Sequence, residues 1–210
     1  MARAASVPSR FLVLAAFVLV PTVRVGATGE SPAAVIEKFH AALLSVMRRA
    51  DALGYGGRVA VLRPVIAATL DLPYMAKKAV GRHWKAFSPE QRTRIVTTFS
   101  KLTVATYAAR FDGYGGERFE TLGREPGAYG TVLVRSRLIK SDGDDVDLTY
   151  RLHRASDGWR IVDIFLKGTV SELAMRRSEY VAVIRRKGFG ALIAALNRKI
   201  RAYAAGEPAR

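Results

Sequence analysis

Asp163 is the residue whose type and setting most directly suggest chemistry. It lies in the segment WRIVDIFLKGTVS, residues 159–171, where it interrupts the apolar run 161–166. A lone carboxylate or imidazole in an apolar pocket can act as the acid or base of an isomerase or a hydratase. The other candidates for this work are His153, Tyr150 and His83. An unpaired buried carboxylate costs several kcal/mol, so Asp163 requires hydrogen-bond donors whether or not it is catalytic.

The remaining motifs give little support for catalysis or metal binding. The sequence has no cysteine, three scattered histidines and no nucleophile elbow around a serine. The acidic run DGDDVD, residues 142–147, lacks the correctly placed glycine and the twelfth-position glutamate of a calcium loop. The two Gly-Tyr-Gly-Gly loops lack the lysine of a phosphate cradle. We therefore predict no catalytic residue, no metal and no cofactor, with a small-pocket, isomerase-like enzyme using Asp163 as the alternative.

The elements that must position these side chains include an antiparallel sheet. Alternating polar and apolar residues predict four strands, over residues 118–122, 131–140, 146–153 and 159–166. In the third strand, Tyr150 and Leu152 fall on the apolar face, whereas His153 falls on the polar face. Short links at residues 142–143 and 157–158 end in glycine and are typical of hairpins. We expect an antiparallel meander.

The fourth strand differs from the third because both of its faces are apolar. Trp159, Ile161 and Phe165 alternate onto one face together with Asp163, and residues 162, 164 and 166 on the other face are apolar too. A strand that is apolar on both faces is covered on both faces. Helices can cover one face, and the other requires further helices or an apolar ligand.

Capping signals divide the sequence before the sheet into helices. Ser31 followed by proline opens the first helix, which should end before residues 54–57. A second helix is expected over residues 58–70, interrupted or bent at Pro64. Asp71 can cap a third helix that holds Met75, Val80 and Trp84.

The clearest local signal is the sequence SPEQ at residues 88–91. It has the capping-box pattern, with Ser88 as cap, Gln91 reaching back and proline in the first turn, so it predicts a long helix. The apolar arc of that helix is wide, which indicates more than one packing neighbour. After the sheet, Ser171 caps a further helix, and Gly188 and Gly190 separate it from a last helix.

The N-terminus has the pattern of a secretory signal. Arg3 and Arg10 form a positive region, residues 11–20 are an unbroken apolar run, and cleavage is expected after Ala27. Ten apolar residues are too few to cross a bilayer, which requires about 20. An uncleaved anchor is the alternative. We therefore expect an exported, soluble, periplasmic protein with one domain over residues 28–210, its compact part over about 32–203.

The mature chain is strongly basic. The formal net charge is +16, and removal of three signal-segment arginines leaves +13. Outside the cytosol this charge favours an anionic membrane surface or an acidic protein face as partner. Nucleic acid is disfavoured by the export signal and by aromatic residues that fall on buried stripes. Because 25 of the 34 basic residues are arginine in an alanine-rich chain, compositional bias is an alternative explanation.

Several segments together resemble the MlaC (toluene-tolerance) family of periplasmic lipid-binding proteins. They are GRHWKAFSPEQR, GYGG, YRLHRASDGWRIVDIFLKGTVSELAMRRSEY and GFGALIAAL, between about residues 32 and 203. The stretch 167–177 more closely resembles the subgroup associated with hopanoid biosynthesis. The resemblance implies an α+β fold with an NTF2-like core, in which a curved four-stranded antiparallel sheet is wrapped by N- and C-terminal helices around a deep apolar pocket.

The resemblance also implies a function and its partners. The protein would be a non-enzymatic carrier that shuttles a hopanoid or a phospholipid between an inner-membrane ABC-type or other lipid export complex and an acceptor membrane or complex. A periplasmic protein-interaction module is a further alternative. Docking on the partner would open the pocket, and transient membrane contact would accompany transfer. Arg176 and Arg177 are possible headgroup or partner contacts. The expected pocket lining is Val80, Trp84, Phe99, Leu102, Tyr150, Leu152, Ile161, Phe165, Val170, Leu173 and Ile184.

Overall fold

The computed structural model describes residues 1, 30–141 and 143–207. The predicted signal segment and its cleavage site at Ala27 lie outside these residues, apart from Met1, and stay predictions. The prediction of one domain over residues 28–210 also stays a prediction.

Two helices form the N-terminal part of the fold. Helix α1 spans Pro32–Met47, and the Ser31 side chain accepts a hydrogen bond from the Ala34 backbone N–H, as the capping signal predicts. Helix α2 spans Ala50–Thr69. The expected boundary at residues 54–57 is a local break inside α2, where Gly54 has φ 56° and ψ 179°. Glycine adopts this backbone without the Cβ clash that opposes it in other residues.

Helix α3 spans Leu72–Val80, with Asp71 accepting from the Tyr74 backbone N–H. Gly81 ends α3 at φ 57°, so Trp84 lies in the following 3-10 segment η1, Gly81–Ala86, instead of in the third helix. Helix α4 spans Pro89–Arg110, and both halves of the predicted capping box between Ser88 and Gln91 are present.

The sheet contains five antiparallel strands in chain order. They are β1 Arg118–Pro126, β2 Val132–Ile139, β3 Val146–Ala155, β4 Gly158–Leu166 and β5 Val170–Ser171, with the short segment η2, Ala128–Gly130, between β1 and β2. The predicted meander is confirmed. The fifth strand was not predicted; it forms because the turn at Lys167 and Gly168, both with positive φ, returns the chain to the edge of β4.

A β-bulge in β4 corrects the predicted faces of that strand. Leu152 pairs with Ile161 and Arg151 pairs with Asp163, so Val162 is an extra residue between two regular pairs. A bulge of one residue reverses the facing of everything beyond it. Ile161 therefore shares the inner face of the sheet with Tyr150 and Leu152, whereas Phe165 pairs with Thr149 on the outer face. The prediction that Ile161 and Phe165 share a face was wrong.

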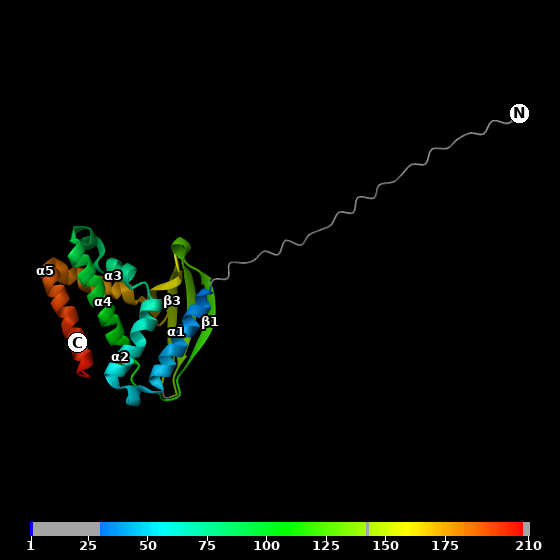
Figure 1. The fold of residues 1–210 in the computed structure, drawn as a ribbon, viewed down its shortest axis with the longest axis horizontal. Coiled ribbons are helices and arrows are strands. Elements are labelled where there is room, and N and C mark those ends of the chain that lie inside the picture. The colour runs from blue at the N-terminus through cyan, green and yellow to red at the C-terminus, as the bar shows by residue number, and fades with distance from the viewer. Residues whose placement is uncertain (2–29, 142, 208–210) are drawn as a thin grey trace.

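The helices lie on the inner side of the sheet (Figure 1). Helix α1 packs against β1, β2 and β4, α2 lies beside α1, and α4 packs against both α2 and α5. Helix α5 spans Glu172–Ala204 and contains a non-helical residue at Gly188, with φ 79°, where the sequence predicts separate helices. Fully buried side chains of α1, α2, α4 and the inner sheet face meet in one core that includes Ile36, Phe39, Leu62, Ile95, Phe99, Leu152 and Ile161.

Candidate functional site

A cavity of about 560 Å³ opens between the C-terminal half of α4, the inner face of the sheet and the start of α5. Its volume falls within the usual range of small-molecule pockets, about 300–1,000 Å³. The apolar part of the lining comes from Met47, Leu70, Met75, Phe111, Leu138, Val146, Leu148, Ile164, Leu166 and Leu173. The inward side chains of β2, β3 and β4 alternate with outward ones, which places one apolar row of each strand on the wall.

Three charged side chains form a cluster at the cavity lining. Glu172 lies between two arginines: its carboxylate is 3.4 Å from Arg110 Nη1 and 3.6 Å from Arg176 Nη2. Arg176 also donates from Nη1 to Thr103 Oγ1 at 3.3 Å, and its guanidinium lies over the Phe99 ring. Charge-assisted hydrogen bonds are usually about 2.7–2.9 Å long, so these ion pairs are loose. An apolar wall combined with such a cluster suits an amphiphilic ligand.

A buried pair of polar side chains joins α1 to β3 at the cavity wall, where Tyr150 is part of the lining and His40 is not. His40 Nε2 and Tyr150 Oη are 2.9 Å apart, and the His40 ring stacks on Phe119 at 3.9 Å between centroids. Burial lowers the pKa of His40 to about 3 and raises the pKa of Tyr150 well above its usual value. Burial likewise raises the pKa of Tyr107, which also lines the cavity. All three groups are therefore neutral at pH 7, so neither the two lining tyrosines nor the imidazole behind Tyr150 adds charge to the cavity wall.

Because burial opposes protonation of His40, we predict that the free energy of unfolding falls in acid. The folded-state pKa of about 3 lies below the unfolded value of about 6.5, so the unfolded chain binds the proton first and stability falls as pH drops through this window. At pH 5 the loss is about 2 kcal/mol relative to pH 7.5. His40→Gln removes this contribution. Urea midpoints of both proteins at pH 7.5 and pH 5 test it, and an equal acid shift in the two proteins would contradict it.

The candidate acid–base residues do not converge on the cavity. Asp163 accepts hydrogen bonds from Ile164 N, Leu173 N and Ser171 Oγ at 2.8, 3.1 and 2.7 Å, and it does not line the cavity. His153 lies 2.9 Å from the carboxylate of Asp71, the cap of α3. His83 lies in η1 and, like Asp163 and His153, is absent from the lining, whereas Tyr150 is part of it. Asp163 therefore joins the sheet edge to the start of α5.

The structure divides the residues predicted to line the pocket. Tyr150 and Leu173 lie on the cavity, and so does Arg176, which was predicted as a headgroup or partner contact. The others do not line it: Phe165 faces the opposite side of the sheet and Val170 is 43% exposed, while the Arg177 guanidinium packs near Gly81. The remaining ones are Val80, Trp84, Phe99, Leu102, Leu152, Ile161 and Ile184, all buried or half-buried in the core. Lipid contact of all of these residues stays a prediction.

Sequence reasoning missed much of the actual lining. Leu148 could have been predicted as a lining residue, because it alternates onto the same face of β3 as Tyr150. Phe111, the C-cap of α4, continues the helical stripe of Thr103 and Tyr107, whereas residues 112–115 and Glu117 come from the link between α4 and β1, for which no periodic pattern exists. Met47, Leu70 and Met75 stand at or near helix ends, so helical spacing gave no sign that they would meet at one cavity.

Within residues 30–141 and 143–207, no helix combines the length and the apolar character needed to cross a membrane. The same residues contain no group of three histidine, aspartate or glutamate side chains gathered as a metal site.

The chain has detectable relatives of known identity. The family model described as MlaC protein matches residues 37–198. The intermembrane phospholipid transport system binding protein MlaC of Haemophilus influenzae is 26% identical over 137 residues, which are 63% of this chain and 64% of that protein. A phospholipid-binding protein from Ralstonia solanacearum, solved in complex with a phospholipid, superposes with a TM-score of 0.71. It has 23% identity and matches over 81% of this chain and 97% of that one, which shows a shared fold.

Proposed function

The chain belongs to the MlaC family, and from this premise we propose that it is a periplasmic lipid carrier without enzymatic activity. It holds the apolar part of a hopanoid or a glycerophospholipid in its internal cavity. It passes the lipid between an inner-membrane transport complex, of the ABC type or another type, and an acceptor membrane or complex. The observation that carries the proposal is the 560 Å³ cavity, which has apolar walls and an arginine–glutamate cluster in its lining.

The names of the relatives support the same role. The Haemophilus influenzae protein is named for an intermembrane phospholipid transport system, and the Ralstonia solanacearum protein was solved with a phospholipid. This chain spans 64% of the length of the first of these, so its ligand and its transport complex are proposals. The hopanoid alternative rests on the sequence of residues 167–177 alone.

The contacts of the polar candidates support a carrier over an isomerase-like enzyme. Asp163 already accepts three hydrogen bonds, and His153 is paired with Asp71. Neither side chain is part of the cavity lining, where a substrate would be held. Arg110 and Arg176, which do belong to the lining, suit contact with a polar headgroup, and the carboxylate beside them, Glu172, is shared between their two guanidinium groups.

Burial energy explains why such a carrier needs a partner. A sixteen-carbon chain gains about 12 kcal/mol on leaving water, at about 0.8 kcal/mol per methylene. A bilayer offers the chain nearly the same gain, so exchange between protein and bilayer is close to thermoneutral overall. Release into water is very slow, and contact with a membrane or a transport complex therefore has to open the route.

We expect the protein to carry about one equivalent of lipid when it is purified from the periplasm of a host that makes both phospholipids and hopanoids. Native mass spectrometry gives the stoichiometry, and organic extraction identifies the lipid class. Whether the extracted lipid is a phospholipid or a hopanoid decides between the two proposed ligand classes. A protein that is purified empty and stays empty after incubation with vesicles of either lipid would contradict the carrier proposal.

A further inference from the structure

The positive charge of the chain is concentrated in two segments. Residues 72–111 and 172–207 hold sixteen lysines and arginines against four acidic residues, a net charge of +12. The other described residues from position 30 onward, 30–71, 112–141 and 143–171, hold fourteen against thirteen, a net charge of +1. A general compositional bias towards arginine does not explain this division, because the near-neutral part is also rich in arginine.

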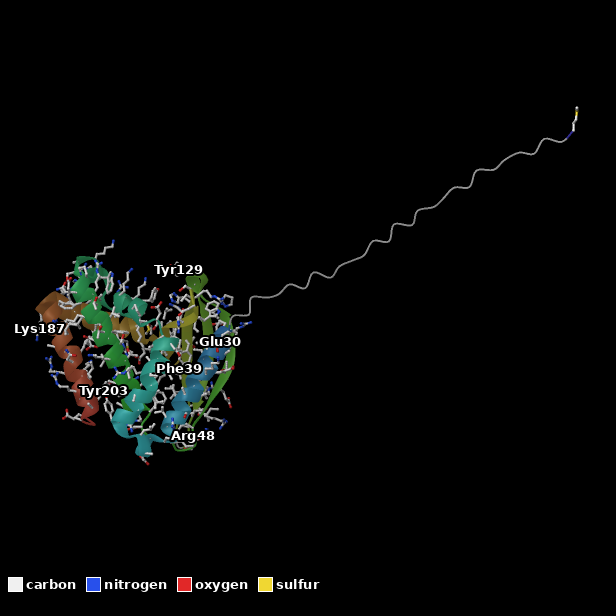
Figure 2. All side chains as sticks on the ribbon, in the orientation of Figure 1. Glu30, Phe39, Arg48, Tyr129, Lys187 and Tyr203 are labelled. Atoms are coloured by element: carbon white, nitrogen blue, oxygen red, sulfur yellow. The ribbon has the colours of Figure 1, made fainter. Side chains whose placement is uncertain are left out.

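The two basic segments form one side of the molecule. They contain α3, η1, α4 and α5, and these helices pack against one another. Lys187 of α5 lies at the end of the molecule opposite the sheet, whereas Glu30 lies beside the sheet (Figure 2). The segments' few acids are partly neutralised, since Glu172 pairs with Arg110 and Arg176 and Glu179 pairs with Lys199.

A concave surface with three cations lies where α5 breaks. Gly188, with φ 79°, ends the first half of the helix, and the second half continues in a new direction. Between the halves is a hollow of about 470 Å³, lined by Val183, Arg186, Lys187, Ala191, Ala194, Ala195 and Arg198. Arg186, Lys187 and Arg198 are exposed, and within the described residues none of them forms an ion pair. The small alanine side chains leave room for an anionic group to approach all three cations.

We infer that this α5 elbow, defined by Arg186, Lys187 and Arg198, docks the protein on an anionic phospholipid bilayer. Each lysine or arginine near an anionic lipid surface contributes attraction, and several together produce stable but salt-sensitive contact. A protein interface generally contains large apolar or aromatic anchors at its centre. Within residues 72–111 and 172–207, Met175 is the one large hydrophobic side chain that is highly exposed, at 47%, and it lies eleven residues before Arg186, so the elbow itself has no such anchor, which favours a headgroup layer over a protein partner.

The docking surface is separate from the cavity, so this inference extends beyond the proposed function and does not depend on it. Glu172, which lines the cavity, and Lys187 are fifteen residues apart along one helical stretch, or about 22 Å at about 1.5 Å per residue. Contact through the elbow therefore leaves the cavity lining unobstructed. Removal of the elbow charges should alter membrane binding without altering the lipid content of the cavity.

A pair of charge-matched triple variants tests the inference. The elbow variant is Arg186→Gln/Lys187→Gln/Arg198→Gln, and the control is Arg124→Gln/Arg135→Gln/Lys167→Gln, which removes three exposed charges from the sheet side. Binding is measured by co-sedimentation with vesicles of phosphatidylcholine and phosphatidylglycerol, and with phosphatidylcholine alone. We expect the unaltered protein to bind only the anionic vesicles, and to be released by salt.

The elbow variant should lose on the order of a hundredfold in affinity, while the control should change by less than about threefold. Equal losses in the two variants would overturn the inference, because they would show attraction by net charge alone. Failure of the unaltered protein to bind anionic vesicles would overturn it as well. Bound lipid is measured in each variant by native mass spectrometry, so an empty cavity would count against the carrier proposal and not against the docking surface.

Discussion

Asp163→Asn is expected to lower the free energy of unfolding by about 3 kcal/mol, because the substitution removes a buried charge that three donors satisfy. The Asp163 side chain is only 6% exposed, and its two oxygens accept from Ile164 N, Leu173 N and Ser171 Oγ. Leu173 is in the first turn of α5, where unpaired backbone N–H groups and the helix dipole favour a negative charge. An amide retains one acceptor oxygen and supplies donors where acceptors are needed.

Two matched variants separate this contribution from general effects. Ser171→Ala removes the helix cap and one donor to Asp163, so we expect a loss of about 1 kcal/mol. Asp147→Asn breaks the exposed pair with Arg137 and should cost less than about 1 kcal/mol. Urea unfolding at pH 7.5 gives all three values. If Asp163→Asn were as stable as Asp147→Asn, the carboxylate would not be holding the start of α5, and a catalytic role would return to consideration.

Local sequence signals predicted the elements of the fold well. The capping box at Ser88 and Gln91, the caps at Ser31 and Asp71, and the alternation in β3 each depend on residues within four positions of one another. The bulge at Val162 depends on pairing with another strand. Because β4 is apolar on both faces, its sequence contained no change in alternation that could have marked the extra residue.

The candidate site was harder to predict because burial and cavity lining have the same sequence signature. Phe99, Leu152 and Ile161 are large, apolar and on inward faces, and the structure uses them to fill the core. A periodic pattern shows that a side chain points inward, but whether it meets another side chain or an open space depends on how the elements pack. The concentration of positive charge on one side of the molecule also depends on how the elements pack. Residues 72–111 and 172–207 form one surface only when α3 and α4 pack on α5.

Leu148→Trp is expected to reduce lipid binding on the order of a thousandfold, because an indole ring would occupy part of the cavity. Leu148 lies on the inner face of β3 and contributes to the lining together with Tyr150, Leu138 and Leu166. If the ring displaces about five methylenes of the ligand, the loss is about 4 kcal/mol at about 0.8 kcal/mol each. Native mass spectrometry after incubation with lipid vesicles measures the loaded fraction.

Thr149→Trp is the matched control for Leu148→Trp. Thr149 is the next residue of the same strand and points to the outer face, where it pairs with Phe165. This variant places the same indole ring on β3 without entering the cavity, so lipid loading should stay near that of the unaltered protein. Far-UV circular dichroism should confirm that both variants fold. Equal loading of the two variants would show that the lipid is held elsewhere. Leu148 and Thr149 are adjacent in β3 but point to opposite faces of the sheet. The comparison therefore separates an effect on the cavity from an effect on the stability of the sheet that forms its wall.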